Sequence, residues 1–196
     1  MASQRELDRA LLQAGKKGSL ADIRALLDRN ADINARDSKR NTPLHDASLR
    51  GRHHYIEPLL DRHADINALN SRDQSPLHLA SLRGRHQCVS LLLDRHANIN
   101  AINSNNQSSL HLASSSGHHQ CVEILLDGHA DINAFDRNSQ SSLHLASSSG
   151  HHECVEILLD RHADINTFDR NSQSSLHLAS SSGHHQCVEI LLDRNA

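Results

Sequence analysis

Histidine, cysteine and serine are the residues of this chain that could take part in chemistry. The sequence contains 18 histidines and four cysteines in 196 residues. Several of the histidines stand two residues after a pair of serines, as in Ser-Ser-Leu-His. Thiolate and imidazole are the usual ligands of zinc, and a serine near a histidine could act as a nucleophile with its base. A metal site and a hydrolytic site are therefore the first hypotheses.

The spacing of these residues argues against both. Two sets recur every 33 residues: Cys88, Cys121, Cys154 and Cys187, and His45, His78, His111, His144 and His177. If each 33-residue unit is a helical repeat in a stack, equivalent residues lie about 10 Å apart, which is too far for a shared zinc ion or a disulfide. Adjacent histidines, as at 53–54 and 118–119, diverge on a helix. No orienting carboxylate, oxyanion-hole motif or glycine-rich phosphate loop accompanies the serines. We therefore predict no catalytic, cofactor-binding or metal site and no enzyme.

The 33-residue period extends over nearly the whole chain. The word around each periodic histidine reads Thr42-Pro43-Leu44-His45, then Ser-Pro-Leu-His at 75–78, and Ser-Ser-Leu-His at 108–111, 141–144 and 174–177. Glycines, Leu-Leu pairs and Ala-Asp-Ile-Asn segments recur in the same register. These words resemble the Thr-Pro-Leu-His signature of ankyrin repeats over about residues 7–196. The resemblance implies an all-α repeat solenoid of stacked helix-turn-helix units with β-hairpin loops.

The register predicts a single ankyrin-repeat domain over residues 1–196. One repeat cannot bury its apolar face alone, so neighbouring repeats must stabilise it and the ends need polar caps. We expect an N-terminal capping repeat at 1–36, full repeats at 37–69, 70–102, 103–135 and 136–168, and a partial C-terminal repeat at 169–196.

Residue types within one repeat explain its predicted shape. Thr42 can cap the first helix, and Pro43 suits the first helical position, where a missing N–H costs nothing. Gly51 can adopt the positive φ that ends this helix. The cysteine of each repeat belongs to the apolar face of the second helix. Burial should therefore keep it in the core.

At two positions of each repeat, other residues stand where the family pattern has glycine. We expect positive φ there, at a cost of roughly 1 kcal/mol each. Pro58 falls inside a second helix, where it should cost about 3 kcal/mol or bend the helix. The loop position holds Arg40, Asp73, Asn106, Ser139 and Ser172, and the position before Ala-Asp holds Asn30, His63, His96, His129, His162 and Asn195.

Composition bears on the compartment and on the class of partner. No apolar segment has the length of a signal peptide or a membrane span, and one cysteine per repeat is unlike a secreted disulfide framework. We expect a soluble monomer in the cytoplasm, with the nucleus as the alternative location. The acidic second half and three aromatic residues oppose nucleic-acid binding.

The resemblance implies that a protein partner binds the concave face, made of loop tips and first-helix ends. Residues 1–101 hold 16 Lys and Arg against 12 Asp and Glu, and residues 102–196 hold 4 against 11. The side chains along the concave face should therefore be basic and apolar in the repeats near the N-terminus, and small and polar in the repeats near the C-terminus. Matching residue by residue gives these contact candidates: Arg36, Lys39, Arg50, Leu69, Arg72, Arg83, Ile102, Phe135 and Phe168.

The predicted function is a protein–protein interaction scaffold. The alternative is an engineered or recently duplicated scaffold without a tuned target, because residues 138–163 and 171–196 differ at only two positions. The resemblance also implies hydroxylation of loop asparagines that have a leucine eight residues upstream and an acidic residue two upstream. Those candidates are Asn34, Asn67, Asn133 and Asn166, and the alternative is a purely structural role of asparagine in the turn.

The periodic histidines predict a pH dependence of stability. We expect His111, His144 and His177 to be neutral, buried and hydrogen-bonded, with folded-state pKa values below the unfolded value. Stability should then fall as the pH drops below about 6.5.

Overall fold

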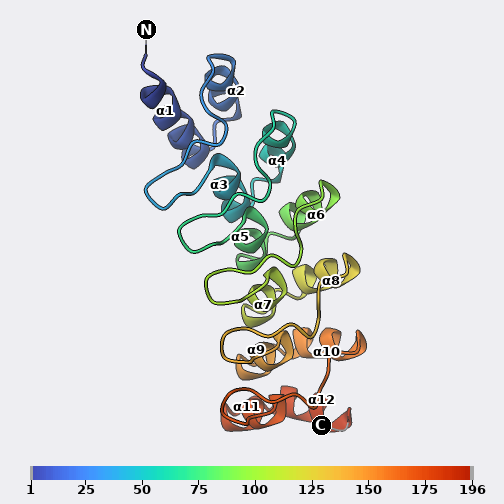
Figure 1. Ribbon diagram of the computed structural model, residues 1–196. Coiled ribbons are helices and arrows are strands. Elements are labelled where there is room, and N and C mark those ends of the chain that lie inside the picture. Colours follow the sequence, from blue (N-terminus) through green and yellow to red (C-terminus); the bar gives the residue numbers. More distant parts are fainter. Residues whose placement is uncertain (1, 195–196) are drawn as a thin grey trace.

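The computed structural model describes residues 2–194, which form an all-α stack of helix pairs (Figure 1). The first helix of each pair lies in one layer and the second helix in the other, and every first helix contacts the first helix of the next pair. The predicted solenoid is confirmed. The first-helix layer contains α1 (Gln4–Lys17), α3 (Pro43–Arg50), α5 (Pro76–Leu82), α7 (Ser109–Ser115), α9 (Ser142–Ser148) and α11 (Ser175–Ser181). The second-helix layer contains α2 (Leu20–Asp28), α4 (His53–Leu60), α6 (His86–Asp94), α8 (His119–Asp127), α10 (His152–Asp160) and α12 (His185–Asp193).

A threonine or serine caps each first helix after α1, with the periodic histidine at the third helical position. In α3, Thr42 Oγ1 accepts the backbone N–H of His45, and His45 Nδ1 accepts the backbone N–H of Thr42 at 3.1 Å. Because Nδ1 is an acceptor, the proton of the neutral ring lies on Nε2. His45 Nε2 donates to the carbonyl of Gln74 at 2.9 Å. One imidazole therefore caps its own helix and ties it to the next loop.

Neighbouring loops are joined to one another. Each reverses the chain as the predicted hairpins do, closed for example by the N–H of Asp37 and the carbonyl of Asn41 at 3.0 Å. The N–H of Ser71 then donates to the carbonyl of Lys39 at 2.9 Å, and later loops repeat this bond. Within residues 2–194 the loops are turns, and no segment forms a β-strand.

The glycine replacements adopt positive φ, as predicted. Arg40 has φ 61° and His63 has φ 64°, and eight other replacements lie close to these values. Asn195 lies outside the described residues. The chain therefore accepts about 1 kcal/mol of strain at each of ten positions.

Leucines, alanines and the cysteine row form the core between the two layers. All four cysteines are fully buried and free, which confirms their predicted core role. Burial raises the pKa of the Cys121 and Cys154 thiols to about 12. These thiols are therefore protonated and unreactive at neutral pH.

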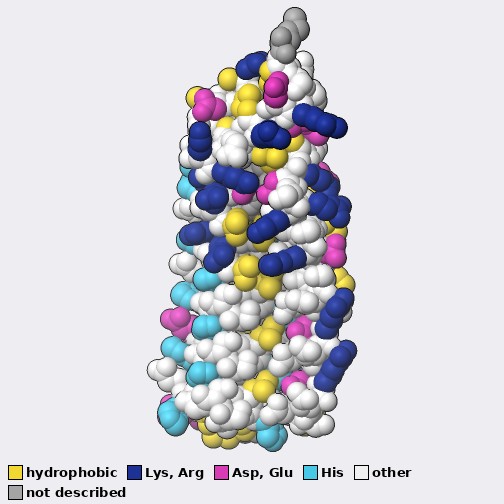
Figure 2. Space-filling view, turned by 90° about the vertical axis from the view of Figure 1, so that its left-hand side faces the viewer, with side chains coloured by type: hydrophobic (Ala, Val, Ile, Leu, Met, Phe, Trp, Pro, Cys, Tyr) yellow, Lys and Arg dark blue, Asp and Glu magenta, His cyan; other side chains and the backbone are white. Residues whose placement is uncertain are grey.

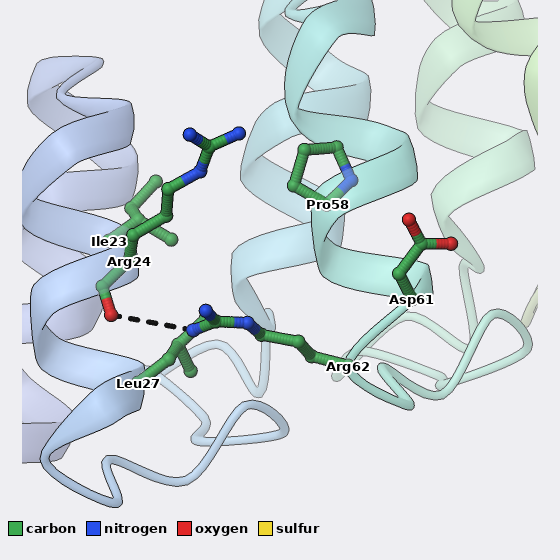
Figure 3. Close-up of a pocket in the computed structure, with 6 residues that line it drawn as sticks. All are labelled: Ile23, Arg24, Leu27, Pro58, Asp61 and Arg62. Carbon is green, nitrogen blue, oxygen red and sulfur yellow. Dashed lines mark hydrogen bonds between the residues drawn. The ribbon is translucent and has the colours of Figure 1, made fainter.

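Pro58 lies inside α4, as predicted. It cannot donate to the carbonyl four residues earlier, and α4 ends at Leu60, one residue before the equivalent end of α6. The Pro58 ring faces Ile23 and Leu27 of α2 across an open pocket of about 380 Å³ (Figure 3). Across this pocket Arg62 donates to the carbonyl of Arg24 at 3.4 Å.

The prediction that His177 is buried is wrong. In the other repeats the following loop covers the ring, whereas no loop follows α12 in the described residues. His177 is therefore exposed, although its Nδ1 still lies 2.8 Å from Ser174 Oγ. Histidines in the same Ser-Ser-Leu-His motif can therefore differ in burial.

Candidate protein-binding surface

Four large apolar side chains stand exposed in one row on the loops. Exposed fractions are 37% for Leu69, 50% for Ile102, 44% for Phe135 and 57% for Phe168. We call these four residues the apolar row. Leu192 is the one other large hydrophobic residue of the described part that is exposed to this extent. Figure 2 views the side of the stack to which the loops project, which we call the loop face, and apolar side chains recur along its length.

The residue that follows each member of the apolar row fixes the loop. Asp136 is 8% exposed, and its Oδ1 accepts the N–H groups of Asn138 at 2.7 Å and of Gln140 at 3.0 Å. Asn70, Asn103 and Asp169 make the same pair of bonds. With this side chain turned into the loop, the preceding residue points outward. The apolar row therefore stands on a rigid base.

The basic candidates occupy the early part of the loop face. Arg36, one repeat before Leu69, is exposed and donates through one guanidinium nitrogen to the carbonyl of Leu69 at 3.1 Å. Figure 2 shows Lys and Arg side chains gathered over the half of the stack nearer the N-terminus. Lys39, Arg50, Arg72 and Arg83 are all exposed.

Two serines end each first helix of the late repeats. Ser116, Ser149 and Ser182 stand at the position of Arg50 and Arg83, and Ser115, Ser148 and Ser181 at the position of Leu49 and Leu82. The Oγ atoms of Ser115, Ser148 and Ser181 each donate to a carbonyl three residues earlier at 3.1 Å. Their hydrogens are therefore used within their own helices. The late first-helix ends are small and polar, and the hydroxyls of Ser116, Ser149 and Ser182 take part in no side-chain hydrogen bond among the described residues.

A buried carboxylate lies beside the basic candidates, and sequence reasoning missed it. Asp46 is 6% exposed, and its Oδ1 is 3.9 Å from Nε of Arg50, while Oδ2 has no hydrogen-bond partner. Burial raises the pKa of the Asp46 carboxyl, and the charges of Lys16 and Arg50 oppose this shift. The signal was in the sequence, because Leu79 and Leu112 occupy the equivalent position in the next two repeats.

Family models match most of the chain. A model of ankyrin repeats in three copies matches residues 57–136 and 128–196, and a model of the single ankyrin repeat matches residues 39–71. The chain belongs to the ankyrin-repeat family. Comparison with curated proteins finds no match. Ankyrin repeats are in general modules of protein–protein interaction, so the predicted family and its broad role are confirmed.

The candidate asparagines connect successive ankyrin repeats. Asn34 Oδ1 accepts the N–H of Asp65 at 2.8 Å, and Asn67 and Asn133 make the equivalent bond to the next repeat at 2.9 Å. Asn166 has no following repeat in the described residues, and its side chain is exposed. The structure therefore gives three of the four a structural role, in which each joins its own loop to the next repeat.

A second row of side chains lies at the other end of the helices, where the first helix turns into the second. His118 packs over Gly84, and its Nε2 is 3.3 Å from the carbonyl of Leu82. A Cβ on Gly84 would lie 2.6 Å from His118 Nδ1, and Gly84 has φ 64°, so both space and backbone require glycine there. His151 and His184 repeat this contact, whereas arginine occupies the position in the early ankyrin repeats. Burial lowers the pKa of His118.

The remaining titratable groups do not converge. Within residues 2–194, no three His, Cys, Asp or Glu side chains lie close enough together to hold a metal ion. In the same range, no helix combines the length and the apolar character that crossing a membrane requires. What this ankyrin stack offers is a long, rigid and chemically graded surface.

Proposed function

We propose that this ankyrin-repeat protein binds a partner protein on its loop face, with the apolar row as the main contact. The exposure of Phe135 and Phe168, the only two phenylalanines of the chain, carries this proposal. Exposed aromatic side chains in a line favour a partner, because their burial on binding releases water from a large apolar area.

The basic candidates extend the proposed interface toward the N-terminus. Arginines and aromatic residues usually dominate interface energies, and here they occupy opposite ends of one face. Rigid loops also favour binding, because little conformational entropy remains to be lost. We propose further that the protein acts as a non-enzymatic monomer in the cytoplasm or nucleus, with neither nucleic acid nor membrane as its target.

One observation favours a second candidate, a recently duplicated scaffold without a tuned target. Residues 138–163 and 171–196 differ only at Glu153/Gln186 and His162/Asn195. The same pair of serines ends the first helix of all three late repeats and adds no distinctive contact. On this hypothesis the two phenylalanines are duplicates of one residue and bind nothing.

Replacement of Phe135 and Phe168 by alanine distinguishes the two candidates. On the binding hypothesis, capture of a partner from lysate should weaken by about 1–3 kcal/mol, the range for truncated interface anchors. The control is Glu123→Gln with Glu156→Gln, on exposed positions of the second-helix layer. Unfolding midpoints should be unchanged in both variants. If the phenylalanine variant unfolds, or if only the glutamate variant loses binding, the loop-face assignment is wrong.

We also retain hydroxylation of Asn34, Asn67, Asn133 and Asn166 as a proposal. The repeat-to-repeat bond of the first three ties up the side chain, whereas Asn166 is exposed without that bond. Incubation with an asparaginyl hydroxylase, followed by mass spectrometry, should therefore show added oxygen first on Asn166. Oxygen on none of the four would refute the proposal.

A further inference from the structure

A pocket of about 780 Å³ opens between α1 and the loop at residues 32–38. Four cationic side chains line it, three from α1 and one from the loop. We call it the basic pocket and define it by Arg5, Arg9, Lys16 and Arg36. Since Arg36 occupies the loop position equivalent to Leu69, the basic pocket continues directly into the apolar row.

Three carboxylates also line this pocket, but each is already hydrogen-bonded within the chain. Asp8 Oδ1 accepts the side-chain amide of Gln4 and the N–H of Asp32, both at 2.8 Å. Asp32 Oδ1 accepts the N–H of Asn34 at 2.9 Å. Asp37 Oδ1 accepts two backbone N–H groups of its own loop at 2.9 Å. These oxygens are therefore fixed by the fold.

The cations are much less engaged. Lys16 Nζ is 3.6 Å from Asp37 Oδ2, and Arg36 uses one nitrogen on the carbonyl of Leu69. Arg5 and Arg9 are exposed, and neither takes part in an ion pair or side-chain hydrogen bond among the described residues. The guanidinium donors of Arg5 and Arg9 are thus free, and four cations against three carboxylates leave the pocket a net positive charge, which suits the carboxylates of a ligand.

We propose that the basic pocket binds the carboxylates of an acidic segment of the protein partner, and that this segment continues as an apolar segment along the row. This inference rests on the proposed loop-face function. It goes beyond that function by giving the partner a chemistry and a direction: acidic at α1, apolar toward α11. The graded charge of the chain also opposes the reverse placement, because the late repeats are acidic and would repel carboxylates.

The repeat spacing sets the length of such a segment. Four repeats separate Arg36 from Phe168, which is about 40 Å at a helix-packing distance near 10 Å. An extended chain covers about 3.3 Å per residue, so about 12 residues reach from the pocket to the last phenylalanine. Adding four residues for the acidic end gives a probe of about 16 residues.

The test uses a phage-displayed library of random 16-residue peptides, selected on the immobilised 196-residue chain. We expect peptides enriched in Asp and Glu at one end and in large apolar residues at the other. By fluorescence polarisation, Arg5→Gln with Arg9→Gln should weaken a selected peptide about tenfold, as expected for loss of two charge-assisted contacts. The matched control is Arg24→Gln with Arg29→Gln. It removes the same charge from exposed residues of the same helix pair and should change affinity less than about twofold.

The outcomes separate this inference from the function on which it rests. Acidic enrichment that disappears on the Arg5/Arg9 variant, but persists on the Arg24/Arg29 variant, supports the basic pocket. Apolar selection without acidic enrichment overturns the pocket and leaves the apolar row standing. Acidic peptides that ignore Phe135→Ala with Phe168→Ala overturn the proposed row and retain the pocket. Failure to select any peptide, or selection only of random RNA in a parallel experiment, overturns both.

Discussion

The early repeats, residues 37–102, and the late repeats, residues 103–194, have the same fold but differ at its contact points. The first helix begins at Pro43 and Pro76 in the early repeats and at a serine in the late ones. The Oγ atoms of Ser109, Ser142 and Ser175 are buried without a hydrogen-bond partner. Both versions form the same capped helix, so the fold tolerates either, and we expect the difference to appear in the free energy of unfolding.

The two regions also differ in the charge that joins neighbouring repeats. Arg52 and Arg85 pack over the preceding glycine in the early repeats, and His118, His151 and His184 do so in the late ones. Arginine keeps its charge at all accessible pH values, whereas burial lowers the pKa of His118 and favours its neutral ring. Acidification should therefore disturb the His118 contact and leave the arginine contacts unchanged.

Acidification should therefore have the largest effect. Burial lowers the pKa of His78 to about 4 and also lowers the pKa values of His45, His111 and His144. A depressed folded-state pKa means that the unfolded chain binds more protons, so stability is full above pH 6.5 and is lost as the pH falls toward the folded pKa. From pH 7.5 to 5.5, His78 alone should cost about 1.4 kcal/mol.

Denaturant unfolding at the two pH values measures this loss, and hydrogen exchange locates it. At pH 5.5 exchange should accelerate most in α5, which contains His78. Carboxylates titrate mostly below this window, with Asp46 acting in the opposite direction. An unchanged unfolding midpoint would contradict the prediction, and uniform opening would remove the difference between the two regions.

Asp46→Leu should stabilise the early region by about 1–3 kcal/mol at pH 7, since it replaces a buried, incompletely paired carboxylate by the residue of the other repeats. The raised pKa means that the folded state holds the Asp46 proton more tightly, so the wild-type penalty is largest above this pKa and shrinks as the pH falls. Unfolding midpoints at pH 7 and pH 4.5 should show the gain decreasing. Asp46→Asn is the control for charge alone, and a destabilised leucine variant would refute this account.

Proline in the late repeats should reduce the difference between the regions. Ser109→Pro and Ser142→Pro place the early residue at the first helical position, where no N–H bond is lost, and remove a buried hydroxyl without a partner. We expect about 0.5–1 kcal/mol of stabilisation for each change, chiefly because the unfolded chain loses freedom. Pro43→Ser and Pro76→Ser are the reciprocal variants and should destabilise by similar amounts in denaturant unfolding.

The smallest effect concerns the boundary between the regions. Arginine and aspartate pair from repeat to repeat as Arg62–Asp28 at 2.9 Å, Arg95–Asp61 at 3.0 Å, Arg161–Asp127 at 2.7 Å and Arg194–Asp160 at 2.6 Å. Gly128 occupies the arginine position opposite Asp94 and interrupts this series. Its φ of −80° is ordinary, and a Cβ would meet the tip of the Ile99 side chain at 2.9 Å.

Gly128→Arg should therefore add less than about 1 kcal/mol, because the approach of its Cβ to Ile99 offsets part of the gain from reduced chain entropy and one exposed ion pair. Gly128→Ala separates the two contributions, because alanine reduces the conformational entropy of the unfolded chain without adding a charge. Thermal unfolding at low and high salt should show a salt-dependent gain for arginine only. Equal gains for both variants would mean that the ion pair contributes nothing.

The sequence by itself determined each repeat. Caps such as Thr42 and Ser108, the helix that follows and the positive φ of Arg40 and His63 depend on residues a few positions apart, so a 33-residue word contains what is needed to predict them. For Phe135 and Phe168 the register in the loop left two alternatives, packing within the hairpin or exposure, and the structure shows exposure.

The tertiary structure decided the surroundings of each repeated motif. His144 and His177 stand in the same Ser-Ser-Leu-His word, yet one ring is buried and the other exposed, because burial depends on the next repeat. Asp46 became a buried carboxylate for the same reason. The basic pocket arose where α1 lies against a loop some 20 residues further along the chain. Local bonds are encoded within a repeat, whereas burial and electrostatic environment are properties of neighbours in the stack.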